Sequence, residues 1–276
     1  MGNNRKVLNA LMVKVDRAYK HLADLQFVDW QFRSRPYPYE IFSEDNLQAG
    51  ERTYYLRMRR EIPPEFSALV GDIAQNLRSA LDHLAWHLVK TSPVIPKAED
   101  RDIYFPIFET AHEYRSGKMR KIKGMTDGAI RAIDAVEPYY RTDVTPGIGN
   151  GAALFALHTI NLQDKHRLLI PVWFATSGHT ITKSRRAEVA NVLRAAFGSE
   201  NANVMVPLEV PSGPLENGSK LCSLPIADVD DNMQFRFRVA LGEPKWVCGK
   251  EIVSTLKNMH KVVQKTILDF DSQGLL

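Results

Sequence analysis

Residues 64–92, which read PEFSALVGDIAQNLRSALDHLAWHLVKTS, form the longest uninterrupted helical pattern in the chain. Apolar side chains recur three and four positions apart, so at about 100° per residue they fall within one arc of a helix. They are Phe66, Leu69, Val70, Ile73, Leu77, Ala80, Leu81, Leu84 and Leu88. Pro64 suits the first turn of a helix, and Pro93 ends one. The stretch therefore predicts a helix over 64–92 with one face in the core.

A polar stripe lies about a third of a turn away from this apolar arc. Its members are Asp72, Asn76, Ser79, His83, Trp86 and Lys90. A helix of this length can serve as the central strut of a bundle, with a neighbour on more than one side. We therefore expect the polar stripe to face a second helix rather than open water.

Three further segments have the helical period, namely residues 3–29, 150–166 and 249–270. Shorter patterns predict helices at 110–122, 126–138 and 185–197. Alternating apolar and polar side chains, or short apolar runs, predict strands at 51–61, 168–174, 179–184, 203–210, 219–227 and 233–241. Residues 30–50 contain the PYPY segment, which cannot continue a helix, and are expected to be irregular.

This order of elements predicts an α+β fold, in which the long helices form a bundle that carries a small, mainly antiparallel sheet. Both termini supply helices to the same bundle, so we expect a single composite domain over residues 1–276. Its helical core would comprise 1–167 and 249–270, and its β-rich portion 168–241.

Composition is that of an ordinary soluble globular protein, with 44% hydrophobic residues and a net charge of +4 over 276 residues. No apolar run is long enough to cross a bilayer, and the charged N-terminal stretch does not resemble a signal peptide. The two cysteines, Cys222 and Cys248, form no C-x-x-C motif. We expect a cytoplasmic protein with reduced thiols, no membrane partner and no cofactor.

Polar residues that can carry chemistry recur in the helices predicted at 64–92 and 150–166. The first helix has Asn76, Arg78, Asp82 and His83, and the second has Asn161, Asp164, Lys165, His166 and Arg167. Packed side by side, the two helices would gather these groups into a small volume. Because buried charges are costly unless paired, the expected arrangement is an ion-paired network with perturbed pKa values.

Two other interpretations of these residues stay open. Arg78 and Asp82 lie four positions apart and can pair along the helix, so the network could belong to a structural or non-catalytic binding protein. Alternatively, His83 and His87 have the spacing of two ligands on one helix face. With His166 they would make a three-histidine site for a metal-dependent hydrolase. The most basic stretch, residues 115–123, is interpreted as a solvated helix face.

RSALDH, residues 78–83, resembles the arginine-x4-histidine pattern of HEPN-type helical proteins, many of which are RNases of toxin or defence systems. The resemblance implies a metal-independent endoribonuclease or RNA-binding protein that acts as a homodimer. Arg78 would hold the phosphate, and His83 would act as general acid or base. On an ideal helix these two residues are about 140° apart. The wider pattern, with GDIAQNLRSALDHLAWHLV and INLQDKHRLL, also resembles a group of uncharacterised bacterial proteins.

Overall fold

The computed structural model describes residues 2–140, 150–166, 170–180, 205–206, 214–229 and 234–276. Within these residues the chain is α+β, as the sequence predicts. The helix expected at 185–197 and Arg167 lie outside the described residues. So do parts of the strands expected at 168–174, 179–184 and 203–210, namely residues 168–169, 181–184, 203–204 and 207–210.

The chain divides into two compact units. The first, helical unit comprises residues 1–29, 64–171 and 241–276, and the second unit comprises residues 30–63 and 172–240. Residues 30–63, which include the strand predicted at 51–61, fall in the second unit. A single composite domain remains a prediction.

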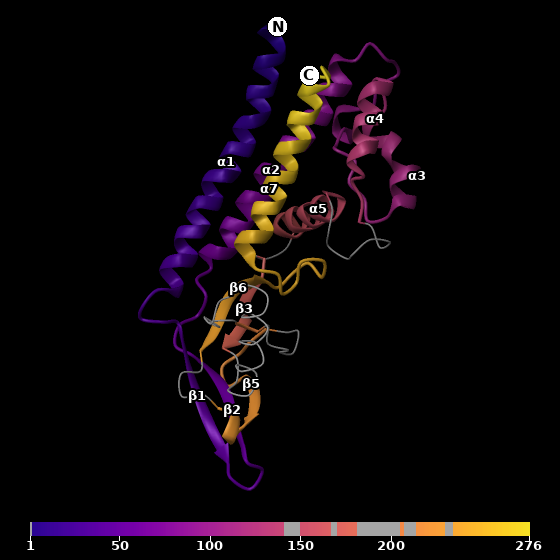
Figure 1. Cartoon of the computed structure of the whole chain (residues 1–276). Helices are drawn as coiled ribbons and strands as arrows, with labels where there is room; N and C mark the ends of the chain where they lie inside the picture. The colour runs from indigo at the N-terminus through magenta and orange to yellow at the C-terminus, as the bar shows by residue number, and fades with distance from the viewer. Residues whose placement is uncertain (1, 141–149, 167–169, 181–204, 207–213, 230–233) are drawn as a thin grey trace, which may run out of the picture. The chain divides into compact units, whose positions relative to one another are not determined.

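The helical unit is built on three long helices that run side by side in Figure 1: α1 (Gly2–Arg33), α2 (Glu65–Thr91) and α7 (Ile252–Ser272). Helix α5 (Asn150–His166) packs against both α2 and α7 and crosses them. The four long helices thus lie where the sequence predicts them. Two short helices complete the unit, α3 (Ala111–Ile122) and α4 (Asp127–Val136), with the single turn η1 (Asp100–Asp102) before them.

Helix α2 is the centre of this unit, and its predicted apolar arc is buried throughout. Ile73, Leu77, Leu81 and Leu84 have no exposed surface, which is the burial expected of a core-facing stripe. The helix ends at Thr91, because Ser92 turns to an extended conformation before Pro93.

Three members of the polar stripe, Asp72, His83 and Trp86, are exposed, so at these positions the stripe does not face a second helix as we expected. Helix α5 instead approaches α2 at Gly71, where a Cβ atom would lie 2.2 Å from Oδ1 of Asp164. Glycine permits this close approach because it has no side chain. Helix α5 therefore packs against the face of α2 that includes Gly71.

The second unit contains two three-stranded sheets, with strand orders β1-β2-β5 and β4-β3-β6. Its strands are β1 (Tyr39–Asn46), β2 (Glu51–Met58), β3 (Val172–Thr180), β4 (Met205–Val206), β5 (Lys220–Pro225) and β6 (Phe235–Leu241). The single turn η2 (Ile226–Asp228) follows β5. The alternation predicted in β2 is confirmed, because Tyr54 and Leu56 are buried while Arg57 is exposed.

The prediction that residues 30–50 are irregular is wrong. Strand β1 pairs antiparallel with β2 from Tyr39 opposite Met58 to Asn46 opposite Glu51, and Gly50 has the positive φ of 65° that the connecting turn requires. The sequence YEIFSEDN has little β-propensity in its second half, and that half is exposed. Pairing with β2 therefore outweighs the local preference.

Candidate functional site

Arg78 and Asp82, one turn apart on α2, form the polar centre of the helical unit. Only 4% of Arg78 is exposed, and its Nη2 atom lies 2.8 Å from Oδ1 of Asp82. The same guanidinium nitrogen donates a hydrogen bond to the Phe105 carbonyl at 2.9 Å, and the Phe105 N–H donates to Asp82 at 3.0 Å. The pair thus satisfies both backbone groups of Phe105 and ties the segment before α3 to α2.

Three more side chains interact electrostatically with this pair. Lys121 from α3 and Lys165 from α5 act on Asp82, and His158 from α5 is affected by the charge of Arg78. Burial raises the pKa of Asp82, while Arg78, Lys165 and Lys121 oppose the rise. We call Arg78, Lys121, His158 and Lys165, grouped around Asp82, the cationic cluster. Two carboxylates oppose its positive charges, because Asp82 interacts with Arg78, Lys121 and Lys165, and Asp164 also interacts with Lys165.

The charges in the cationic cluster repel one another, and the pKa values record this. Burial, with the charge of Arg78 nearby, lowers the pKa of Lys121 to about 8. Burial and the positive charges of Arg78, Lys121 and Lys165 lower the pKa of His158 to about 3, so its imidazole is neutral at physiological pH. A bound anion would relieve the repulsion that contributes to both shifts.

Two buried nitrogen atoms of the cationic cluster lack a hydrogen-bond partner in the described part of the chain, Nη1 of Arg78 and Nδ1 of His158. Leaving a buried polar group unsatisfied costs about 1–3 kcal/mol, so such groups call for an explanation such as a bound molecule. Lys165 is the exposed member of the cluster, whereas Arg78 is 4% exposed. Tyr104 is 46% exposed. Tyr104 interacts electrostatically with Arg78, which places it near the cluster.

The other residues predicted for the site lie apart from the cationic cluster or have local partners. Asn76 donates to the carbonyl of Asp72 in its own helix, and Asp164 packs over Gly71, where burial and the neighbouring Asp72 raise its pKa. Asn161 is buried, with no hydrogen-bond partner for its Oδ1 atom among the described residues. His166 is exposed.

The proposed histidine ligands do not form a metal centre with other residues of the described ranges, where no group of three or more His, Cys, Asp or Glu side chains could hold an ion. His83 and His166 are exposed. His87 is half-buried, and burial lowers its pKa.

Two members of the cationic cluster, Lys121 and His158, were not among the predicted site residues. Lys121 belongs to the most basic stretch of the sequence, so its charge was visible but its burial was not. His158 is the only titratable residue in the run AALFALHTI, and a lone polar residue in an apolar helix is a signal that could have identified it.

Comparisons with protein-family models, curated proteins and solved structures find no match to this chain. None of the described helices combines the length and hydropathy that a bilayer span requires.

Proposed function

We propose that this protein binds RNA through a phosphate group held at the cationic cluster. The observation that carries the proposal is the buried Arg78 guanidinium with an unpartnered Nη1 atom, surrounded by more positive than negative charge. Arginine suits phosphate because its planar fork of donors matches the phosphate oxygens. A phosphate would pair with the ammonium groups of Lys121 and Lys165, and a local opening of the cluster would let it accept the N–H of the buried Nη1 atom of Arg78.

Aromatic side chains beside the cationic cluster favour RNA over a phosphate without a base. Tyr104 is 46% exposed and lies near enough to Arg78 to interact with it electrostatically, so its ring is accessible for stacking. Lys121 lies 4.5 Å from the centroid of the Phe108 ring, which holds the ammonium group against the protein surface. Stacking of a base on an aromatic ring contributes about 1–3 kcal/mol and tolerates any sequence. We therefore expect recognition of single strands with little base preference.

The wild-type protein is expected to bind a short fluorescent single-stranded RNA with an affinity that falls as salt rises. One phosphate neutralised by Arg78, Lys121 and Lys165 gives a slope of log affinity against log salt of roughly −0.7 for a single strand. Inorganic phosphate should compete with the RNA, and EDTA should have no effect. Fluorescence anisotropy measures all three. A salt-independent affinity, or no binding at low salt, would contradict the proposal.

Metal-independent cleavage of the bound RNA is a second candidate function, implied by the resemblance of RSALDH to HEPN-type proteins. The observation that favours it is the exposure of His83, directly after Asp82 on α2. An exposed imidazole can act as a general acid or base towards a ribose hydroxyl. The resemblance implies a homodimer, in which residues of a second copy would act on the phosphate. Arg78 is buried and paired with Asp82 within one copy, so those further residues would have to come from the second copy.

Cleavage of labelled RNA is expected to continue in EDTA and to fall by about 10²-fold or more in His83→Ala, because general acid–base catalysis contributes at least that much. His112→Ala, which removes another exposed histidine, serves as the matched control and should cleave normally. Gel filtration in parallel should show a dimer. Intact RNA, or equal cleavage by wild type and His83→Ala, would exclude this second function while leaving the binding proposal to its own test.

A further inference from the structure

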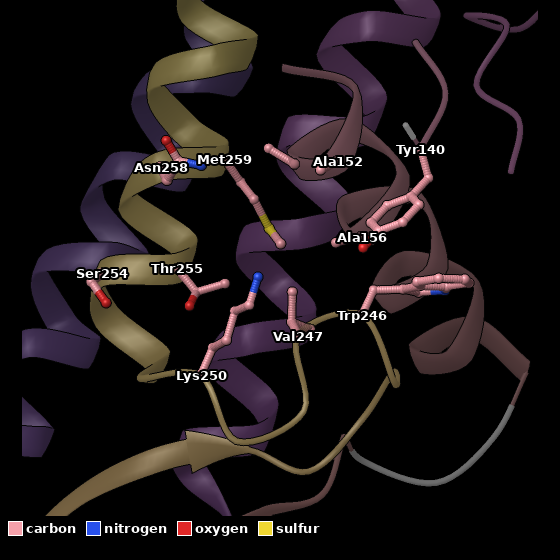
Figure 2. Close-up of a pocket in the computed structure, with 11 residues that line it drawn as sticks. Tyr140, Ala152, Ala156, Trp246, Val247, Lys250, Ser254, Thr255, Asn258 and Met259 are labelled. Atoms are coloured by element: carbon pink, nitrogen blue, oxygen red, sulfur yellow. The ribbon is translucent and has the colours of Figure 1, made fainter. Parts of the chain in front are cut away.

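A cavity of about 210 Å³ lies between α5, α7 and residues 244–250, away from the cationic cluster. Its volume is below the roughly 300–1,000 Å³ of pockets that hold drug-sized ligands, so it fits a molecule with one ring or a short chain. Figure 2 shows its lining side chains converging from both helices and from the loop.

One wall of the cavity is apolar and flat. Ala152 and Ala156, one turn apart on α5, leave room because their side chains are single methyl groups. The rings of Tyr140 and Trp246 lie beside them with centroids 4.6 Å apart, and Phe155 meets Trp246 edge-on at 5.5 Å. These contacts hold the indole in place, so the aromatic surface exists before a ligand arrives.

The opposite wall is polar and carries a positive charge. Thr255 and Asn258 line it from α7, and Figure 2 shows the Lys250 ammonium group pointing into the cavity. The carboxylate of the adjacent residue, Glu251, caps helix α7. It accepts hydrogen bonds from the N–H groups of Val253 at 2.9 Å and Ser254 at 2.6 Å. No carboxylate pairs with Lys250 in the described ranges.

We propose that this cavity binds a small carboxylate with an aromatic or compact apolar body. The carboxylate would pair with Lys250 and accept hydrogen bonds from the polar wall of α7, and the body would lie against Trp246 and the alanine methyl groups. A charge-assisted hydrogen bond in a partly desolvated site is strong and directional, so the charge selects the ligand and the apolar wall supplies contact area. The site is independent of the cationic cluster and of the proposed RNA binding.

Benzoate and its neutral isostere benzamide are the probes, titrated against the full chain by ligand-observed NMR. Wild type is expected to bind benzoate about tenfold or more tightly than benzamide, because only benzoate pairs with the ammonium group. Lys250→Met should remove this preference and leave benzamide binding unchanged. The matched control is Lys245→Met. The ammonium group of Lys245 lies 4.1 Å from the centroid of the Trp246 ring, and Lys245 does not line the cavity.

Lys245→Met should keep the wild-type preference for benzoate. The proposal is overturned if wild type binds neither probe, if it binds both equally, or if Lys250→Met keeps the preference. Lys250 is exposed, so a folding defect is not expected, and an unchanged circular dichroism spectrum would establish that the variant is folded.

Discussion

Asp82→Ala is expected to lower the free energy of unfolding by about 3–5 kcal/mol, because it leaves the Arg78 guanidinium buried without its counter-ion. The Phe105 N–H loses its acceptor in the same variant. Urea denaturation of wild type and variant measures the difference. The matched control is Asp269→Ala, which removes the acid of another i,i+4 pair, with Lys265, on the surface of α7. Exposed pairs contribute about 1 kcal/mol or less, so the control should change little.

A second variant separates two causes of this loss of stability: the unpaired Arg78 charge and the missing Asp82 carboxylate. In Arg78→Met combined with Asp82→Ala no buried charge is left unpaired, so the loss of stability should be smaller than in Asp82→Ala alone. It should not vanish, since the Phe105 carbonyl and N–H both lose their partners. Equal destabilisation by Asp82→Ala and Asp269→Ala would contradict the structural role assigned to the buried pair.

The stability of the protein is expected to fall as pH drops from about 6.5 towards 4, because of His158. Its pKa is about 3 in the folded chain, against an ordinary value of 6.5. Between these values the unfolded chain binds a proton that the folded chain does not, so acid favours unfolding. The loss from this group approaches about 1.4 kcal/mol per pH unit at full effect.

The difference between wild type and His158→Phe isolates this contribution, because other groups titrate in both proteins. Urea unfolding at several pH values should give a wild-type curve that falls more steeply below pH 6.5 than the curve of the variant. His21→Ala, which removes a histidine on α1, should follow wild type. Parallel curves for wild type and His158→Phe would show that the folded protein does not hold His158 neutral.

The long helices could be predicted because their apolar residues recur with the helical period over many turns. Residues 64–92 have nine apolar positions on one arc, and no other structure explains that period. Strand β1 could not be predicted in the same way, since its sequence carries no period of its own. Its structure comes from pairing with β2, which only the folded chain supplies.

The part of the candidate site that lies within a single helix could be predicted from the sequence. Arg78 and Asp82 are four positions apart, so their pairing follows from helical geometry. The position of Lys121 near them could not be predicted, because it depends on tertiary contacts. Arg78 and Asp82 bind the backbone of Phe105, in the segment that precedes α3, and Lys121 lies on α3. The assignment of the polar stripe was wrong because a glycine, Gly71, decides where α5 packs.

The central claim is that the cationic cluster holds an RNA phosphate, and the RNA affinities of Lys121→Met and Lys123→Met test it most directly. Both variants remove one positive charge from the same stretch, but Lys121 belongs to the cluster and Lys123 is exposed beyond the end of α3. We expect Lys121→Met to weaken binding by about tenfold or more at neutral pH and low salt, and Lys123→Met by about twofold or less. Because the pKa of Lys121 is about 8, the difference between wild type and Lys121→Met should shrink above that pH. Equal affinities for the two variants would contradict the account.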